Sequence, residues 1–211
     1  MVKGKLRGSS PTNPEDARQG FRSWHERGYL PHRDEPGLTQ FVTFRLADSF
    51  PESLRSEWEH LWKIEDDQQR RTELEAYLDR GRGKCHLHKP AIASLVEDAL
   101  RFFHGERYDL RAWVVMPNHV YVLFKVDATP MAEILGSWKK HTAQKANQML
   151  KQRGEFWQAD YWDTYHRRHG ASWLSFILCH HHWMLEGARN GRVACAAFST
   201  AQRMGVCGHL F

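Results

Sequence analysis

The sequence predicts one α+β domain, in which strands and amphipathic helices alternate along the chain. Within residues 112–124, two apolar runs rich in β-branched residues meet at a Pro-Asn break, which is typical of neighbouring strands, and the predicted strands are 108–115 and 119–126. A third run, 39–46, also has the composition and alternation of a strand. Helical periodicity follows Pro90 and Pro130, so the predicted order is strand, helix, strand, strand, helix.

Side chains alternate across each predicted strand. In the first strand, Thr43 and Arg45 therefore share one face, and in the strand 119–126 His119 and Tyr121 project together. A polar pair on a central strand can form the floor of an active site. A buried histidine packed beside a tyrosine explains the same pattern, and the residues alone do not decide between the two.

Helices are also expected between the first strand and the next one. Ser49 and Glu52 flank Pro51 in a capping-box arrangement, which predicts that a helix begins there. A second, charged helix is predicted over about residues 67–78. We expect these helices to form an insertion, about residues 52–80, that packs on the domain.

The chain as a whole is basic, and its composition indicates a protein outside the membrane. Its 211 residues include 30 Lys and Arg against 25 Asp and Glu, a net charge of +5, which suits a polyanionic partner without requiring one. Residues 1–35 are polar, basic and interrupted by prolines, so a flexible N-terminal arm is expected there. No apolar run has membrane-spanning length, no signal peptide is evident, and the cysteines form no CxxC pair, which together predict a cytoplasmic location.

Two groups of residues are candidates for holding nucleic acid. Lys139 and Lys140 lie on the helix after Pro130, where they either contact phosphates or form an ordinary solvated face. The stretch 156–168 combines aromatic rings with polar and basic side chains, and its candidates are Trp157, Gln158, Tyr161, Arg167 and Arg168. Aromatic rings can stack on unpaired bases, and arginines neutralise phosphates, although core packing accounts for one or two of these rings more simply.

The segment AWVVMPNHVY, residues 112–121, resembles the VVMPNHVH segment of REP-associated tyrosine transposases, which belong to the HUH endonuclease superfamily. The resemblance continues in separate blocks at 40–46, 105–108, 138–140 and 156–163. It implies a ferredoxin-like antiparallel sheet with helices on one face. It also implies a transposase-like domain at residues 36–165, followed by a divergent C-terminal tail at 166–211.

The resemblance implies a chemistry as well. In that family two histidines bind a divalent metal, Mg²⁺ or Mn²⁺, which polarises a scissile DNA phosphate while a tyrosine attacks it. His119 carries over as one metal ligand, but Tyr121 replaces the second histidine. Counting forward from Tyr161 places Leu178 at the position of the nucleophile, so Tyr165, the last tyrosine of the chain, is the remaining candidate nucleophile.

Three functions remain open on the sequence. The first is a transposase-like protein that binds single-stranded or hairpin DNA, in the context of DNA transposition, without cutting it. The second is an active metal-dependent nicking transposase with altered ligands. The third is a non-functional remnant whose tail is read out of frame. Cleavage of hairpin DNA separates the first two, and salt-dependent binding separates the first from the third.

Overall fold

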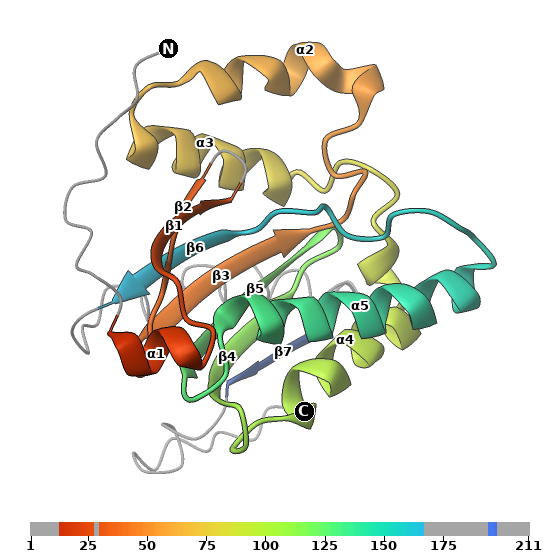
Figure 1. Cartoon of the computed structure of the whole chain (residues 1–211). Helices are drawn as coiled ribbons and strands as arrows, with labels where there is room; N and C mark the ends of the chain where they lie inside the picture. The colour runs from red at the N-terminus through yellow and green to blue at the C-terminus, as the bar shows by residue number, and fades with distance from the viewer. Residues whose placement is uncertain (1–12, 28–29, 167–193, 198–211) are drawn as a thin grey trace.

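The computed structural model describes residues 13–27, 30–166 and 194–197, and within them it confirms the predicted α+β fold. The central antiparallel sheet has the order β6-β3-β5-β4-β7 (Figure 1). Its strands are β3 (Thr39–Arg45), β4 (Tyr108–Val115), β5 (His119–Val126), β6 (Trp162–His166) and β7 (Ala194–Ala197). Helix α4 (Pro90–Phe102) lies between β3 and β4 in the chain, and α5 (Met131–Leu150) joins β5 to β6. The order β6-β3-β5-β4 is that of a ferredoxin-like sheet.

Helices α4 and α5 pack together on one face of this sheet, as predicted. Strand alternation directs Val42, Phe44, Val120, Val122 and Phe124 to this face, where they join the main hydrophobic core. The Tyr108 hydroxyl donates to the Leu100 carbonyl of α4 and accepts from Trp138 Nε1 of α5, both at 2.8 Å. One phenol therefore provides a hydrogen-bond partner for a polar group on each helix. Within the described ranges, no helix combines the length and apolar character needed to cross a bilayer.

The helical insertion is present after β3, and α2 and α3 lie together at one end of the sheet, apart from α4 and α5 (Figure 1). It comprises the 3-10 helix η1 (Glu52–Leu54), α2 (Arg55–Trp58), the 3-10 helix η2 (Glu59–Lys63) and α3 (Asp67–Asp79). Leu74, Tyr77 and Leu78 of α3 form a second hydrophobic cluster with Trp162 of β6. The insertion is therefore attached to the domain by apolar packing.

The expected capping box at the start of the insertion does not form. The Ser49 hydroxyl donates to the Leu46 carbonyl at 2.8 Å and accepts from Arg45 at 3.1 Å. Pro51 occupies the cap position of η1, and no side chain caps this helix. A turn directly after β3 thus engages the hydroxyl that the capping box requires.

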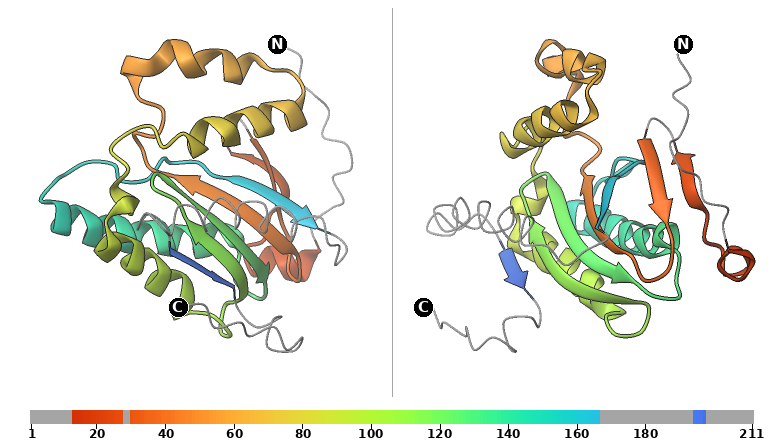
Figure 2. Two further views of the ribbon diagram at one scale, coloured as in Figure 1. Left: turned by 180° about the vertical axis from the view of Figure 1, so that it is seen from behind. Right: turned by 90° about the vertical axis from the view of Figure 1, so that its left-hand side faces the viewer.

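The expected flexible arm covers residues 1–35, of which 1–12, 28 and 29 lie outside the described part of the chain, while regular structure occurs within residues 13–27 and 30–35. They form the short helix α1 (Pro14–Arg18) and a hairpin of β1 (Ser23–Arg27) and β2 (Leu30–Asp34), which lies beside β6 (Figure 2). His32 of β2 is fully buried and binds Asp163 of β6, and the Met131 amide donates to Asp34 at 2.9 Å. Buried polar contacts thus hold β2 on the domain.

Candidate functional site

The residues predicted from the strand pattern lie on the sheet face opposite α4 and α5. In the β3–β5 register Arg45 is paired with His119 and Thr43 with Tyr121. In the β3–β6 register Thr43 is also paired with Trp162. Because residues paired across antiparallel strands share a face, these five side chains form one continuous patch facing the insertion.

The His119 and Tyr121 part of this patch is closed by α3. His119 is fully buried, its Nδ1 lies 2.8 Å from Asn118 Oδ1, and its Nε2 lies 3.5 Å from Asp79 Oδ1 on α3. The Tyr121 ring meets the His119 ring edge to face, with centroids 4.6 Å apart. Burial, together with the carboxylates of Asp79 and Glu75, raises the pKa of Tyr121 well above its usual value. This phenol is therefore neutral at physiological pH.

These residues do not fit a catalytic metal. Within the described part of the chain, no group of three or more His, Cys, Asp or Glu side chains could hold an ion. A neutral phenol is a poor ligand for Mg²⁺ or Mn²⁺, so Tyr121 does not supply the second donor beside His119. His119 also has no solvent-exposed surface at which a DNA phosphate could complete the coordination.

Tyr165 lies far from His119 along the sheet. Its backbone in β6 is paired with Gln40, whereas His119 is paired with Arg45, five residues further along β3. At about 3.3 Å per residue, this offset is roughly 16 Å. The structure therefore does not place the backbone of Tyr165 near the motif histidine. Leu178, Arg167 and Arg168 lie outside the described residues.

The candidates on α5 and in the aromatic block divide into structural and exposed residues. Lys139 Nζ donates to the carbonyls of Gln158 and Ala159, at 2.6 and 2.8 Å, and so holds the segment before β6, while Lys140 is exposed. Trp157 is buried, and its Nε1 donates to Thr142 Oγ1 at 2.8 Å. Tyr161 is buried in the same core. Core packing thus accounts for both rings.

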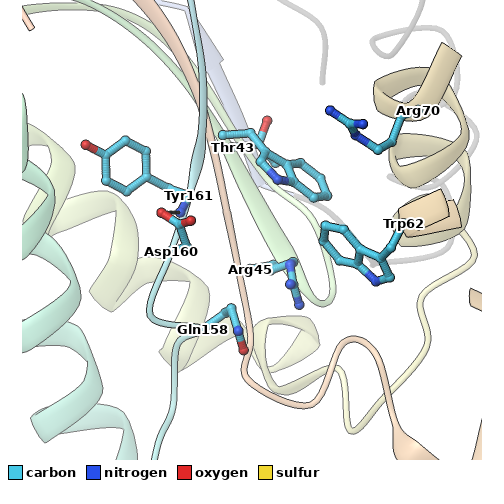
Figure 3. A pocket seen from close by; sticks show the side chains of 8 residues that line it. Thr43, Arg45, Trp62, Arg70, Gln158, Asp160 and Tyr161 are labelled. Carbon is cyan, nitrogen blue, oxygen red and sulfur yellow. Dashed lines mark hydrogen bonds between the residues drawn. The ribbon is translucent and has the colours of Figure 1, made fainter. Parts of the chain in front are cut away.

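Beside His119 and Tyr121, which α3 covers, the same sheet face opens into a cavity of about 550 Å³ between β3 and the insertion (Figure 3). Figure 3 shows Thr43 and Arg45 facing Trp62 of η2 and Arg70 of α3. The lining residues are Thr43, Arg45, Trp62, Arg70, Gln158, Asp160, Tyr161 and Trp162. Two of these residues, Gln158 and Tyr161, are among the DNA-binding candidates that the sequence predicts.

Arg45 is the central cation of this cavity. Its guanidinium lies over the Phe50 ring, 4.3 Å from the centroid, and 5.8 Å from the centroid of Trp162. Its Nη1 donates to Ser49 Oγ at 3.1 Å, and no carboxylate of the described residues forms an ion pair with it. Burial lowers the pKa of Arg45 to about 10, and Asp160 attracts it only at longer range. Arg45 thus remains charged in a partly buried position.

A second cation balances the carboxylates at the edge of the cavity. His32 Nδ1 binds Asp163, and its Nε2 lies 3.4 Å from Asp160 Oδ1. Burial alone lowers the pKa of His32, but the hydrogen bonds to Asp160 and Asp163 outweigh it and raise the pKa to about 9. The protonated imidazole partly neutralises Asp160, so this carboxylate repels an anion in the cavity less strongly.

Neither a known protein family nor a curated protein matches the chain. Among solved structures, the chain is similar to a REP-associated tyrosine transposase bound to a REP hairpin, with 18% sequence identity and a TM-score of 0.32. The similarity covers 70% of this chain and 64% of that one, less than two thirds of the transposase. At this TM-score the likeness decides nothing about function.

Proposed function

We propose that the protein binds single-stranded DNA that contains a hairpin, and that it holds this DNA without cutting it, as a transposase-like DNA-binding protein. The observation that carries the proposal is the Arg45 guanidinium at the wall of a cavity of about 550 Å³, a partly buried charge that forms no ion pair with any carboxylate of the described residues. Burying an unpaired charge is costly, and an anion bound in the cavity would offset that cost.

The rest of the cavity favours a ligand that carries a flat ring as well as a negative charge. Indole rings of Trp62 and Trp162 line it together with Arg45 and Arg70. Nucleotides combine a phosphate with a stacking base, and proteins that bind single strands use this pairing of cations and aromatic rings. The cavity volume lies in the range typical of ligand pockets. The net charge of +5 adds a general attraction to nucleic acid.

The motif residues support binding rather than cleavage. His119 is buried beneath α3, and Tyr121 is neutral. The Tyr165 backbone lies roughly 16 Å along the sheet from His119. A nicking reaction that combines a metal on His119 with attack by Tyr165 therefore finds no support in this arrangement.

Fluorescence anisotropy with a labelled DNA hairpin carrying a single-stranded extension tests the proposal, with a blunt duplex of the same composition for comparison. We expect the hairpin to bind more tightly and its affinity to fall as salt rises from about 50 to 200 mM. Arg45→Met should weaken binding by about 10-fold or more, as loss of a charge-assisted hydrogen bond does. It should also lower the log-log salt slope by about 0.7.

Arg55→Met is the matched control, because Arg55 is exposed on α2 and pairs with Glu52 at 2.8 Å. This variant should bind the hairpin as the unmodified protein does. Absence of binding to any hairpin would refute the proposed function. Equal binding by the Arg45 variant would place the DNA elsewhere, and cleaved product on a denaturing gel with Mn²⁺ would refute the absence of cutting.

A further inference from the structure

We propose that the cavity between β3 and the insertion is a pocket for one unpaired nucleotide, whose base stacks on Trp62 while its phosphate lies against Arg45. The inference rests on the proposed DNA binding and assigns base recognition to the helical insertion. Three observations support it: Trp62 is more exposed than Trp162, the Phe50 ring packs against Trp62, and Arg45 lies on the same Phe50 ring.

The two tryptophans have different parts in this pocket. Trp162 is 9% exposed and packs into the cluster of α3, whereas Trp62 of η2 is only partly buried. Their ring centroids are 6.4 Å apart and their planes are inclined by 56°. A base between two parallel rings needs about 7 Å. A base therefore does not fit between these rings, and it stacks on Trp62, with Trp162 as the floor.

The Phe50 side chain contacts both the Trp62 ring and the Arg45 guanidinium. Phe50 contacts the Trp62 ring, with centroids 5.8 Å apart, and it stacks on Tyr77 of α3 at 4.8 Å. The Arg45 guanidinium lies on the same Phe50 ring. Because Phe50 links β3 to the insertion, Trp62 and Arg45 are held at a defined separation before any ligand binds. Such preorganisation reduces the entropy lost on binding.

The polar residues that line the cavity can form hydrogen bonds with the edge of a stacked base. Thr43, Gln158 and Asp160 are among the lining residues, and their hydroxyl, amide and carboxylate groups include both donors and acceptors. A base inside a duplex does not expose its ring face, and reaching this pocket would require it to leave the stack. The pocket thus favours nucleotides that are already unpaired, such as those in a loop or extension.

Abasic scanning of the DNA tests this inference. In a hairpin with a single-stranded extension, each unpaired nucleotide is replaced in turn by an abasic site, and affinity is measured with the unmodified protein and with Trp62→Ala. We expect one position at which the abasic site weakens binding to the unmodified protein by about 5- to 150-fold, the range of one stacked base. With Trp62→Ala the same replacement should change affinity by no more than about twofold.

Two further variants keep the result interpretable. Trp62→Phe retains an aromatic face and should recover part of the abasic effect. Phe102→Ala removes a ring that is 73% exposed on α4, away from the cavity, and should leave the abasic effect at its full size. Thermal unfolding of each variant shows whether the insertion remains folded.

The outcomes separate this inference from the proposed function. If the unmodified protein binds no hairpin, both are wrong. If it binds, but every abasic replacement has the same effect with and without Trp62, only the nucleotide pocket is wrong. Competition by a free nucleoside monophosphate as effective as competition by the hairpin would also contradict it, because the pocket would then serve a small molecule rather than a nucleotide within a strand.

Discussion

Replacing His32 by asparagine should change how the stability of the protein depends on pH. The His32 pKa is raised from 6.5 to about 9 in the folded protein, which therefore holds this proton more tightly than the unfolded chain does. The resulting stabilisation is complete below pH 6.5 and is lost as pH rises toward 9. At about 1.4 kcal/mol per pKa unit, the loss is about 3 kcal/mol. The imidazole is fully buried, so solvent screens this contribution little.

Urea denaturation at several pH values between 6 and 9.5 measures this effect. We expect the unmodified protein to lose stability across this window more steeply than His32→Asn. The gap between the two should be widest below pH 6.5, where the variant leaves Asp160 and Asp163 without their cation. His60→Asn, a change at an exposed position in η2, controls for the loss of an imidazole. Parallel curves for the unmodified protein and His32→Asn would refute the reasoning.

Two further predictions concern α5 and the motif. Lys139→Ala should lower the free energy of unfolding by about 1 to 3 kcal/mol, because the Lys139 ammonium donates hydrogen bonds to two carbonyls before β6. Lys140→Ala, at an exposed position next to it, should leave the free energy of unfolding unchanged. Equal stability of the two variants in urea would contradict this. Tyr121→His should create a binding site for Mn²⁺, because it adds an imidazole beside His119 and Asp79. We expect calorimetry to detect Mn²⁺ binding to this variant and not to the unmodified protein. The double variant Tyr121→His, Asp79→Asn should bind Mn²⁺ more weakly than Tyr121→His alone. If titration with Mn²⁺ releases the same heat for the unmodified protein and for Tyr121→His, the predicted metal site is wrong.

Local patterns were sufficient to predict the scaffold. The strands β4 and β5 have the bounds that were predicted for them, and α4 begins at the proline that marks it. Alternation also placed His119 and Tyr121 together on one face. These features depend on residues a few positions apart, because side-chain direction repeats every two residues in a strand and a proline limits the geometry of its own turn.

The candidate site was only partly predictable. Arg45 could be placed on a face of β3, but its burial depends on Phe50 and on Trp162, which lies in a distant strand. Trp62 had the spacing of an ordinary apolar residue in a helix, and nothing in that spacing shows that its ring lines a cavity. A charged residue within an apolar strand was the one local signal that pointed to Arg45.

What the sequence by itself determined is therefore the order of strands and helices from β3 to α5, the presence of the insertion, and the faces on which the motif residues lie. Only the tertiary structure decided that β2 packs on the domain, since His32 finds its partner Asp163 131 positions along the chain. It also decided that α3 covers His119 while Arg45 faces a cavity. Whether a side chain is buried, paired or exposed depends on contacts between distant segments, and those contacts have no local period from which they could be predicted.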